Sequence, residues 1–150
     1  MAKDFAQLSD SLKARIADIA KSMGGGSVKV GFMAGALYPD GTPVAAVAAK
    51  NEYGDPSENR PPRPFFRRMI EAEQSTWAGK LVKAAQFTGG DAVKSLGLLG
   101  EDIAGALQKS INDFQDPALA DSTIARKGFA KPLIDTAHMI NSVTYVVEES

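Results

Sequence analysis

The chain has 150 residues, 44% hydrophobic and 23% charged, which is the composition of a globular protein large enough to bury a core. Its formal net charge of -1 excludes a general electrostatic attraction to nucleic acid or to an anionic membrane. The absence of cysteine excludes disulfides, thiolate metal sites and cysteine nucleophiles. No long apolar run and no leader pattern occurs, so we expect neither a transmembrane helix nor a signal peptide, and folding in a reducing cytoplasm.

The first segment is predicted to be an amphipathic helix over residues 4–23, followed by a strand. The three glycines at 24–26 end the helix, because glycine adopts the left-handed conformation of a helix C-terminus. Residues 28–33 are typical of a strand with Val28, Val30 and Phe32 on one face. The apolar face of the helix recurs at steps of three and four, as Phe5, Leu8, Leu12, Ile16, Ile19 and Met23.

A turn and a short helix are expected next. Residues 38–42 combine proline with Asp-Gly, a strong turn signal that we expect to build a β-hairpin. Pro43 is predicted to open a helix that ends near Tyr53 and Gly54. Residues 55–64 contain proline, arginine and asparagine without a periodic apolar face, which predicts an extended, exposed loop.

Two longer helices are predicted in the middle of the chain. The first follows Pro64 and places Phe66, with Met69, Ile70, Trp77 and Leu81, on the core side. The second starts at an Asp91 N-cap and runs to about residue 114, with an apolar stripe of Val93, Leu96, Ile103, Leu107, Ile111 and Phe114. Its glycines at 97, 100 and 105 indicate close packing against a helix of the same chain, or else a subunit contact or hinge.

The C-terminal part is predicted to hold a surface connection, a helix and a strand. Residues 116–131 form the connection, Asp135 or Thr136 caps a short helix through Met139 and Ile140, and Val143, Tyr145 and Val147 share one strand face. The resulting fold class is α+β: a single small domain over residues 1–150, with a small, mostly antiparallel sheet packed against several helices. Within it, the N-terminal helix 4–23 precedes a sheet-and-helix body at 28–150.

A search for catalytic chemistry gives no candidate site. His138 is the only histidine and the chain has no cysteine to join it at a metal, so a place on a helix surface or subunit contact is favoured. The glycines before Ser27 stand between a helix and a strand, the reverse of a phosphate-binding loop. Acidic pairs such as Glu71 with Glu73 have no evident shared pocket. We therefore expect no catalytic residue, no cofactor and no metal, and a protein that is not an enzyme.

The most distinctive local feature is a basic segment at residues 60–68. Four arginines (Arg60, Arg63, Arg67 and Arg68) alternate there with three prolines and two phenylalanines. The prolines stiffen the backbone and lower the entropy lost on docking. Three interpretations stay open for the arginines: salt bridges within the domain, pairing with acidic groups of an adjacent subunit, or contact with nucleic-acid phosphates.

Three stretches of the sequence resemble the tail-completion, or head–tail joining, proteins of tailed bacteriophages. The first combines residues 30–32 and 44–48 with Asn51-Glu52-Tyr53-Gly54, and the second is Pro61-Pro62-Arg63-Pro64-Phe65-Phe66-Arg67. The third comprises Lys127, Pro132-Leu133-Ile134-Asp135-Thr136, Met139, Ser142-Val143 and Tyr145. Such proteins usually have glycine after Asp-Thr, whereas this chain has Ala137, which questions the turn at that point.

The resemblance implies a structural virion protein of the phage neck, assembled in the host cytoplasm. It implies a homo-oligomeric ring, with a hexamer favoured and a dodecamer as the alternative, between a portal-side adaptor and a tail terminator or tail tube protein. Genomic DNA would pass through the open channel without sequence-specific contact. The interface residues expected on this basis are Tyr53, Arg60, Pro61, Pro62, Arg63, Phe65, Phe66 and Arg67. The alternative is a nucleic-acid-binding protein that uses the arginines of residues 60–68.

Overall fold

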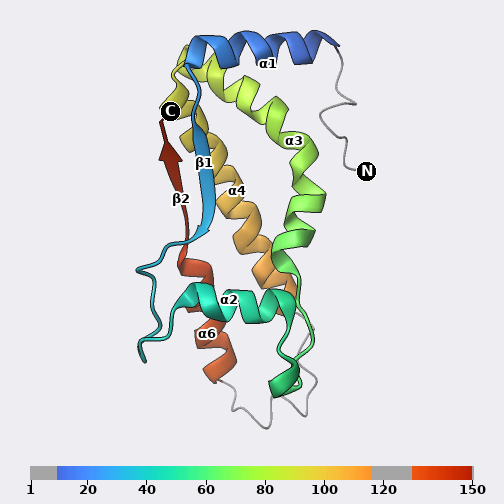
Figure 1. The fold of residues 1–150 in the computed structure, drawn as a ribbon, viewed down its shortest axis with the longest axis vertical. Coiled ribbons are helices and arrows are strands. Elements are labelled where there is room, and N and C mark those ends of the chain that lie inside the picture. Colours follow the sequence, from blue (N-terminus) through green and yellow to red (C-terminus); the bar gives the residue numbers. More distant parts are fainter. Residues whose placement is uncertain (1–9, 116–129, 150) are drawn as a thin grey trace. The chain divides into compact units, whose positions relative to one another are not determined.

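A computed structural model describes residues 10–115 and 130–149 of the chain (Figure 1). Two strands, β1 (Ser27–Phe32) and β2 (Val143–Glu148), pair as an antiparallel sheet, and the remaining elements are helical. This confirms the predicted α+β class with a small sheet packed against helices. The helices are α1 (Asp10–Met23), α2 (Val44–Tyr53), α3 (Phe65–Thr88), α4 (Ala92–Gln115) and α6 (Ala130–Asn141), with a 3-10 turn, η2, at Pro56–Glu58.

The residues group into two compact units, while the expected single-domain organisation stays a prediction. The first unit contains the chain up to Val30, then Met69–Gly105, and the residues from Tyr145 onward. The second contains Gly31–Arg68 and Ala106–Thr144. Each unit contains its own part of α3 and of α4.

In the first unit, α3 and α4 are joined by a short turn that side-chain hydrogen bonds hold in place. Asp91 caps α4 by accepting a hydrogen bond from the Lys94 amide at 2.9 Å, as the sequence predicts. The Thr88 and Ser95 hydroxyls lie 2.7 Å apart, which gives the completely buried Ser95 a polar partner. The core of this unit consists of Met69, Val82, Ala84, Ala85, Leu96, Leu99, Ile103 and Ala104.

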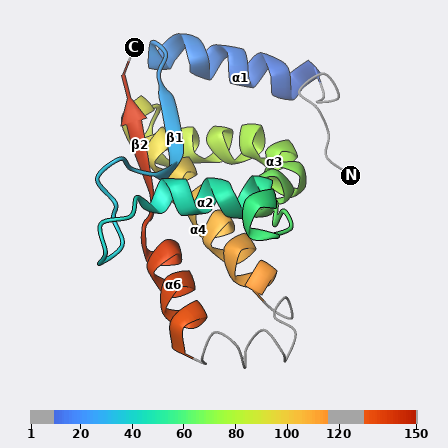
Figure 2. The ribbon, with the colours of Figure 1, turned by 60° about the horizontal axis from the view of Figure 1, so that its bottom comes forward.

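The sheet packs on α4 at a position where only glycine fits (Figure 2). A Cβ placed on Gly100 would lie 2.7 Å from the Tyr145 ring and 2.8 Å from Val28 Cγ2. The close contact predicted for the α4 glycines is therefore real at Gly100, but the neighbour is the sheet and not a helix. Gly105 has open space around its Cα and needs no such explanation.

In the second unit, α2, the start of α3, the end of α4 and α6 surround one apolar core. Val44, Leu107 and Ile111 are fully buried, and Phe65 is 2% exposed. The carbonyl oxygen of Leu37 lies 2.8 Å from His138 Nε2, and the His138 ring lies 4.8 Å from that of Tyr38. His138 is thus a helix-surface residue, as expected, that ties α6 to the loop before α2.

Several sequence expectations are corrected by the structure. The residues around the turn at 38–42 add no strand to the sheet and form a single bridge between Leu37 and Pro43. Two backbone hydrogen bonds flank this bridge, from the Tyr38 amide to the Thr42 carbonyl and from the Val44 amide to the Ala36 carbonyl, and the pairing ends there because α2 begins at Val44. Pro43 precedes α2 as its N-cap instead of opening it. Helix α6 begins at Ala130 and not at a cap near 135, since Pro132 is tolerated in a first turn. Residues 4–9 of the predicted first helix and 116–129 of the predicted connection lie outside the described residues.

The buried face of α3 includes Met69, as the sequence indicated, but it contains Phe65 in place of Phe66. Phe65 and Met69, four positions apart, are buried, whereas Phe66, Ile70, Trp77 and Leu81 are only half-buried. On α4 the predicted stripe holds from Leu96 to Ile111, but Val93 is 41% exposed and Phe114 is half-buried.

Candidate functional site

All eight residues expected at an interface belong to one stretch of the second unit, the α2–α3 junction, which we define as residues 51–68. The junction contains the last turn of α2, η2, the proline segment and the first turn of α3. Tyr53 is 70% exposed, and Pro61, Pro62 and Arg67 are exposed as well. Arg60, Arg63 and Phe66 are half-buried. Phe65 is 2% exposed, so it supports this surface from below rather than forming part of it.

A single buried carboxylate joins the two helices of the junction. Glu52, in the last turn of α2, is 5% exposed. Its Oε2 accepts a hydrogen bond from the Phe66 amide at 2.9 Å, and its Oε1 accepts one from the Arg67 amide at 3.1 Å. These amides lie in the first turn of α3, where a helix has no partners of its own for its N–H groups. A negative charge at that position also interacts favourably with the helix dipole.

Arg67 completes the same cluster from the side. Its Nε donates to Glu52 Oε1 and its Nη2 donates to the Glu52 carbonyl, both at 2.9 Å. The guanidinium carbon also lies 5.4 Å from the centre of the Tyr53 ring, which is a cation–π distance. Arg67 is therefore committed to its own chain, while the Tyr53 ring beside it remains on the surface.

Gly54 allows the proline segment to return against the end of α2. Its backbone has φ +79°, and a Cβ there would lie 2.9 Å from both the Arg60 carbonyl oxygen and the Pro62 nitrogen. The Arg63 amide donates to the Asn51 carbonyl at 2.6 Å, which fixes the same segment from the other side. A side chain at position 54 is excluded by conformation and by space together.

Residues 55–60 are not the extended loop that the sequence predicted. Asp55 and Arg60 exchange two backbone hydrogen bonds at 2.9 Å, so the segment closes on itself around η2. The Asp55 side chain caps η2 by accepting from the Ser57 amide at 3.1 Å. The hydrogen bond from the Ser57 side chain, aided by Lys50, lowers the pKa of the Asp55 carboxyl below its usual value. An aspartate cap followed by proline closes the loop, and this overrides the composition that favours an open one.

The adjacent residues Phe65 and Phe66 have different surroundings. The Phe65 carbonyl accepts a hydrogen bond from the Ser110 hydroxyl at 2.6 Å, which holds the first turn of α3 against α4. The Phe66 ring lies edge-on to Phe32, with ring centres 6.5 Å apart. Phe65 is therefore the phenylalanine that fixes the start of α3 in the core, while the Phe66 ring stays half-buried.

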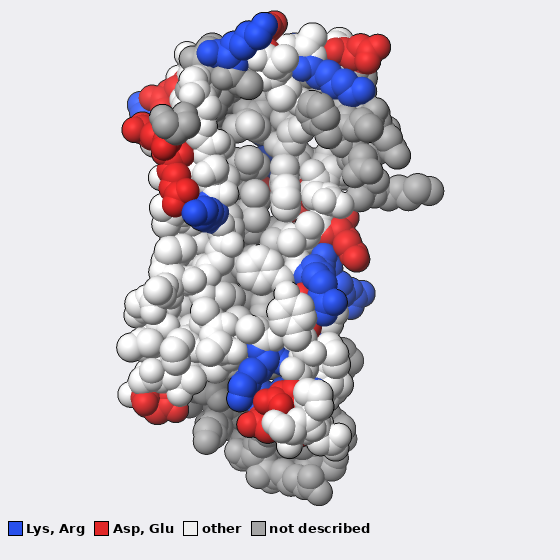
Figure 3. Space-filling model, viewed as in Figure 1, with Lys and Arg blue, Asp and Glu red and all other residues white. Residues whose placement is uncertain are grey.

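The arginines of the junction alternate with carboxylates and do not form a continuous basic surface. Arg60 pairs with Glu58 at 3.1 Å, Arg67 pairs with Glu52 at 2.9 Å, and Arg68 lies over the Phe114 ring at 5.1 Å. On the face drawn in Figure 3, Lys and Arg side chains lie next to Asp and Glu side chains. Arg63 and Arg68 make no ion pair within the part of the junction that the structure describes, and of these two only Arg68 lies over an aromatic ring.

Glu52 is the residue whose role the sequence does not reveal. A capping glutamate is normally recognised by its place three residues after an N-cap, within the helix that it caps. Glu52 caps α3 from a different helix, 14 residues before Phe66. The only available signal is its position inside the Asn-Glu-Tyr-Gly stretch that carries the family resemblance.

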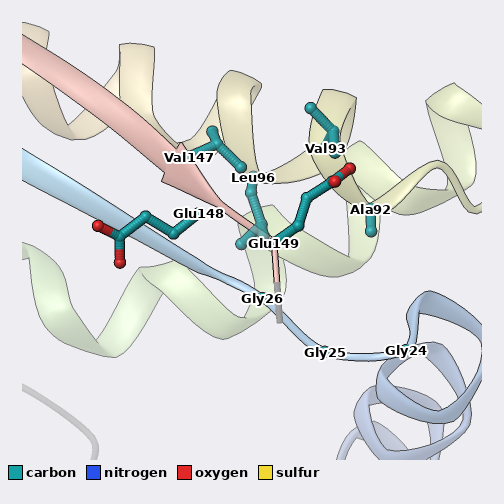
Figure 4. A pocket seen from close by; sticks show the side chains of 9 residues that line it. All are labelled: Gly24, Gly25, Gly26, Ala92, Val93, Leu96, Val147, Glu148 and Glu149. Carbon is teal, nitrogen blue, oxygen red and sulfur yellow. The ribbon is translucent and has the colours of Figure 1, made fainter.

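A small pocket lies in the first unit. It has a volume of about 250 Å³ and lies between the three glycines after α1, the start of α4 and the end of β2 (Figure 4). Glu149 reaches toward the first turn of α4, while Glu148 points to the other side. The lining offers two carboxylates beside apolar carbons and no imidazole or hydroxyl side chain, so it presents no nucleophile–base pair.

Within residues 10–115 and 130–149, no three His, Asp or Glu side chains come together as metal ligands would. No described helix is long and apolar enough to cross a membrane. Comparisons of the chain with protein-family models, curated proteins and solved structures found no match.

Proposed function

We propose that this protein is a structural subunit of the neck of a tailed bacteriophage, where copies of it form a ring that joins the DNA-filled head to the tail. The adjoining partners would be a portal-side adaptor and a tail terminator or tail tube protein, and DNA would pass through the ring. A hexamer is favoured and a dodecamer is the alternative. The proposal has its origin in the resemblance of three sequence stretches to head–tail joining proteins.

The observation that carries the proposal is the direct bonding between two of those stretches. Glu52 and Gly54 of the Asn-Glu-Tyr-Gly stretch contact the backbone of residues 60–67, which contain the Pro-x-Pro-Phe-Phe-Arg stretch. Two motifs separated in sequence thus form one rigid structure with Tyr53, Pro61 and Pro62 exposed. A preordered surface with an aromatic ring and prolines loses little entropy on docking, which suits assembly of a virion.

The charge arrangement favours docking to protein over binding to nucleic acid. A nucleic-acid surface needs cations free to neutralise phosphates. Here Arg60 and Arg67 are already paired with carboxylates of their own chain.

Electron microscopy of lysates from a phage with an early stop codon in this gene tests the proposal. Filled heads and finished tails that lie unjoined are the expected result. Restoration of joined particles by a plasmid copy of the gene is the control. Intact virions without the protein would exclude a neck role, and salt-dependent DNA binding by the purified chain would then support the nucleic-acid alternative.

A further inference from the structure

The outer side of α4 carries a glycine that no contact within the chain explains. Leu98, Glu101 and Gly105 follow one another at steps of three and four, so they lie on one side of the helix, which we call the α4 face. All three are exposed, Leu98 by 40%. A Cβ on Gly105 would meet no heavy atom within 4 Å. Because glycine is unfavourable in the interior of a helix, the gap at this position indicates a group from outside the subunit that needs the space.

The middle of the α4 face has an excess of negative charge. Lys80 of α3 lies between two carboxylates, 2.6 Å from Asp102 and 3.6 Å from Glu73. Glu101, next to Asp102 in the chain, makes no ion pair among the described residues. Three carboxylates therefore share one ammonium group, and the nearest cation toward the start of α4 is Lys94, two turns before Glu101. A partner that brings a cation to this position is favoured.

The α2–α3 junction has the opposite excess. Five cations and three carboxylates occupy residues 50–68. The ion pairs described for this segment use Lys50, Arg60 and Arg67, which leaves Arg63 and Arg68 without a carboxylate among the described residues. Two junctions placed against each other would bring these positive charges together, which is unfavourable. The surface that fits the junction is therefore a negatively charged one and not a second junction.

We propose that the α2–α3 junction of one copy docks on the α4 face of the next copy. Arg63 pairs with Glu101, and the exposed Tyr53 ring lies against Leu98 and fills the gap at Gly105. A second copy fits as the occupant because every subunit has one junction and one α4 face, and their charge excesses are opposite. The contact is head-to-tail, which builds a ring when the rotation between copies closes. The inference rests on the proposed function only for that closure, since the contact itself can be tested on the purified chain.

Charge reversal on both sides of the contact provides a direct test. Arg63→Glu and Glu101→Arg each place like charges opposite each other when a variant meets its own copies. We expect each purified full-length variant to self-associate at least about tenfold more weakly than the unaltered chain in sedimentation experiments, with an unchanged circular dichroism spectrum. An equimolar mixture of the two variants should recover the association, because every contact in an alternating arrangement then joins a carboxylate to a guanidinium.

Glu71→Arg is the control for this test, because it makes the same charge change at an exposed position of α3. This variant should associate like the unaltered chain, and its mixture with Arg63→Glu should recover less association than the mixture of Arg63→Glu with Glu101→Arg. A mixture of Arg63→Glu with Glu101→Arg that stays as weak as its components would overturn the proposal. An unaltered chain that stays monomeric would overturn it as well.

A second measurement does not depend on charge. Gly105→Gln fills the gap with a side chain that suits an exposed helix position, so the subunit should keep its thermal stability while self-association weakens by at least about tenfold. Gly79→Gln, at a glycine of α3 that also has open space around it, should associate like the unaltered chain. Equal association of both variants would overturn docking at the α4 face. The neck role is scored separately by microscopy of lysates, so failure of one inference is distinguishable from failure of the other.

Discussion

At the residue scale, Glu52 shows how one carboxylate can replace a whole local capping motif. It accepts hydrogen bonds from two amides of α3 and holds the guanidinium that lies beside Tyr53. Its low exposure is compatible with a charge because several donors surround it. The orientation of the exposed Tyr53 and Arg67 side chains therefore depends on a residue that is itself hidden.

Glu52→Ala should lower the free energy of unfolding by about 2 kcal/mol, because two part-buried amides of the first turn of α3 lose their acceptor. Glu52→Gln, which keeps one acceptor oxygen, should lose less. Midpoints of urea unfolding give both values. Glu58→Gln is the control, since Glu58 is an exposed partner of Arg60, and should change the stability by less than about 0.5 kcal/mol. Equal losses for positions 52 and 58 would contradict the capping role.

Lys80 provides a pH-dependent contact between α3 and α4. Its ammonium group lies 2.6 Å from Asp102, and this hydrogen bond raises the pKa of Lys80 above 10.5. A raised pKa in the folded state means that the pair stabilises the fold below pH 10.5 and loses this effect as the pH rises through the higher, folded-state value. An NMR titration should give a pKa for the Lys80 side chain above the ordinary lysine value, and Asp102→Asn should lower that pKa. No change in Asp102→Asn would contradict the assignment.

At the element scale, two glycines of α4 have different surroundings. Gly100 has no room for a side chain because the sheet packs against it, whereas Gly105 has open space around it. Gly100→Ala should destabilise the fold by about 1–3 kcal/mol, because the new methyl would overlap the Tyr145 ring and Val28. Gly105→Ala lies on the same helix in open space and should stabilise by up to about 1 kcal/mol. Thermal unfolding of both variants separates packing from helix propensity. A stabilising Gly100→Ala would mean that the sheet does not press on α4.

The start of α3 gives a second matched pair. Phe65→Ala should cost about 3–5 kcal/mol, because Phe65 is almost completely buried. Phe66→Ala should cost clearly less, because its ring is half-buried and faces Phe32. Chemical denaturation of the two variants gives the comparison. A larger loss of stability in Phe66→Ala than in Phe65→Ala would mean that Phe66 is the core residue, as the sequence indicates.

Much of the fold follows from local patterns in the sequence. The α4 stripe, the Asp91 cap and the alternation in both strands are encoded by residues near one another, so they can be predicted. The identity of the buried phenylalanine, the partner of Gly100 and the cap provided by Glu52 all depend on contacts between distant segments. Periodicity within one helix carries no information about them, and for this reason the sequence singles out the segment at 60–68 but does not reveal the hydrogen bonds that hold it.

At the scale of the whole molecule, Arg63 is the arginine of the junction that has neither an ion pair nor a ring contact within the described chain. It lies on the junction without an ion pair of its own in the described chain, while Arg67 is held by Glu52. We predict that Arg63→Glu blocks the joining of heads and tails but leaves the subunit folded, as measured by phage titre and circular dichroism. Lys83→Glu makes the same charge change at an exposed position of α3 and should leave the titre unchanged. A normal titre for Arg63→Glu would remove Arg63 from the interface.

The closure of residues 55–60 has a consequence for how such a chain can diverge. Because Asp55 and Arg60 already hold the ends of this segment together, extra residues inserted between them would not move Glu52, Gly54 or Pro62. The entropy of closing a longer loop grows only slowly with its length. The length and sequence of residues 56–59 can therefore change without disturbing the rest of the junction. The condition is that Glu52 and Gly54 on one side, and Pro61 and Pro62 on the other, keep their spacing to the Asp55–Arg60 pair.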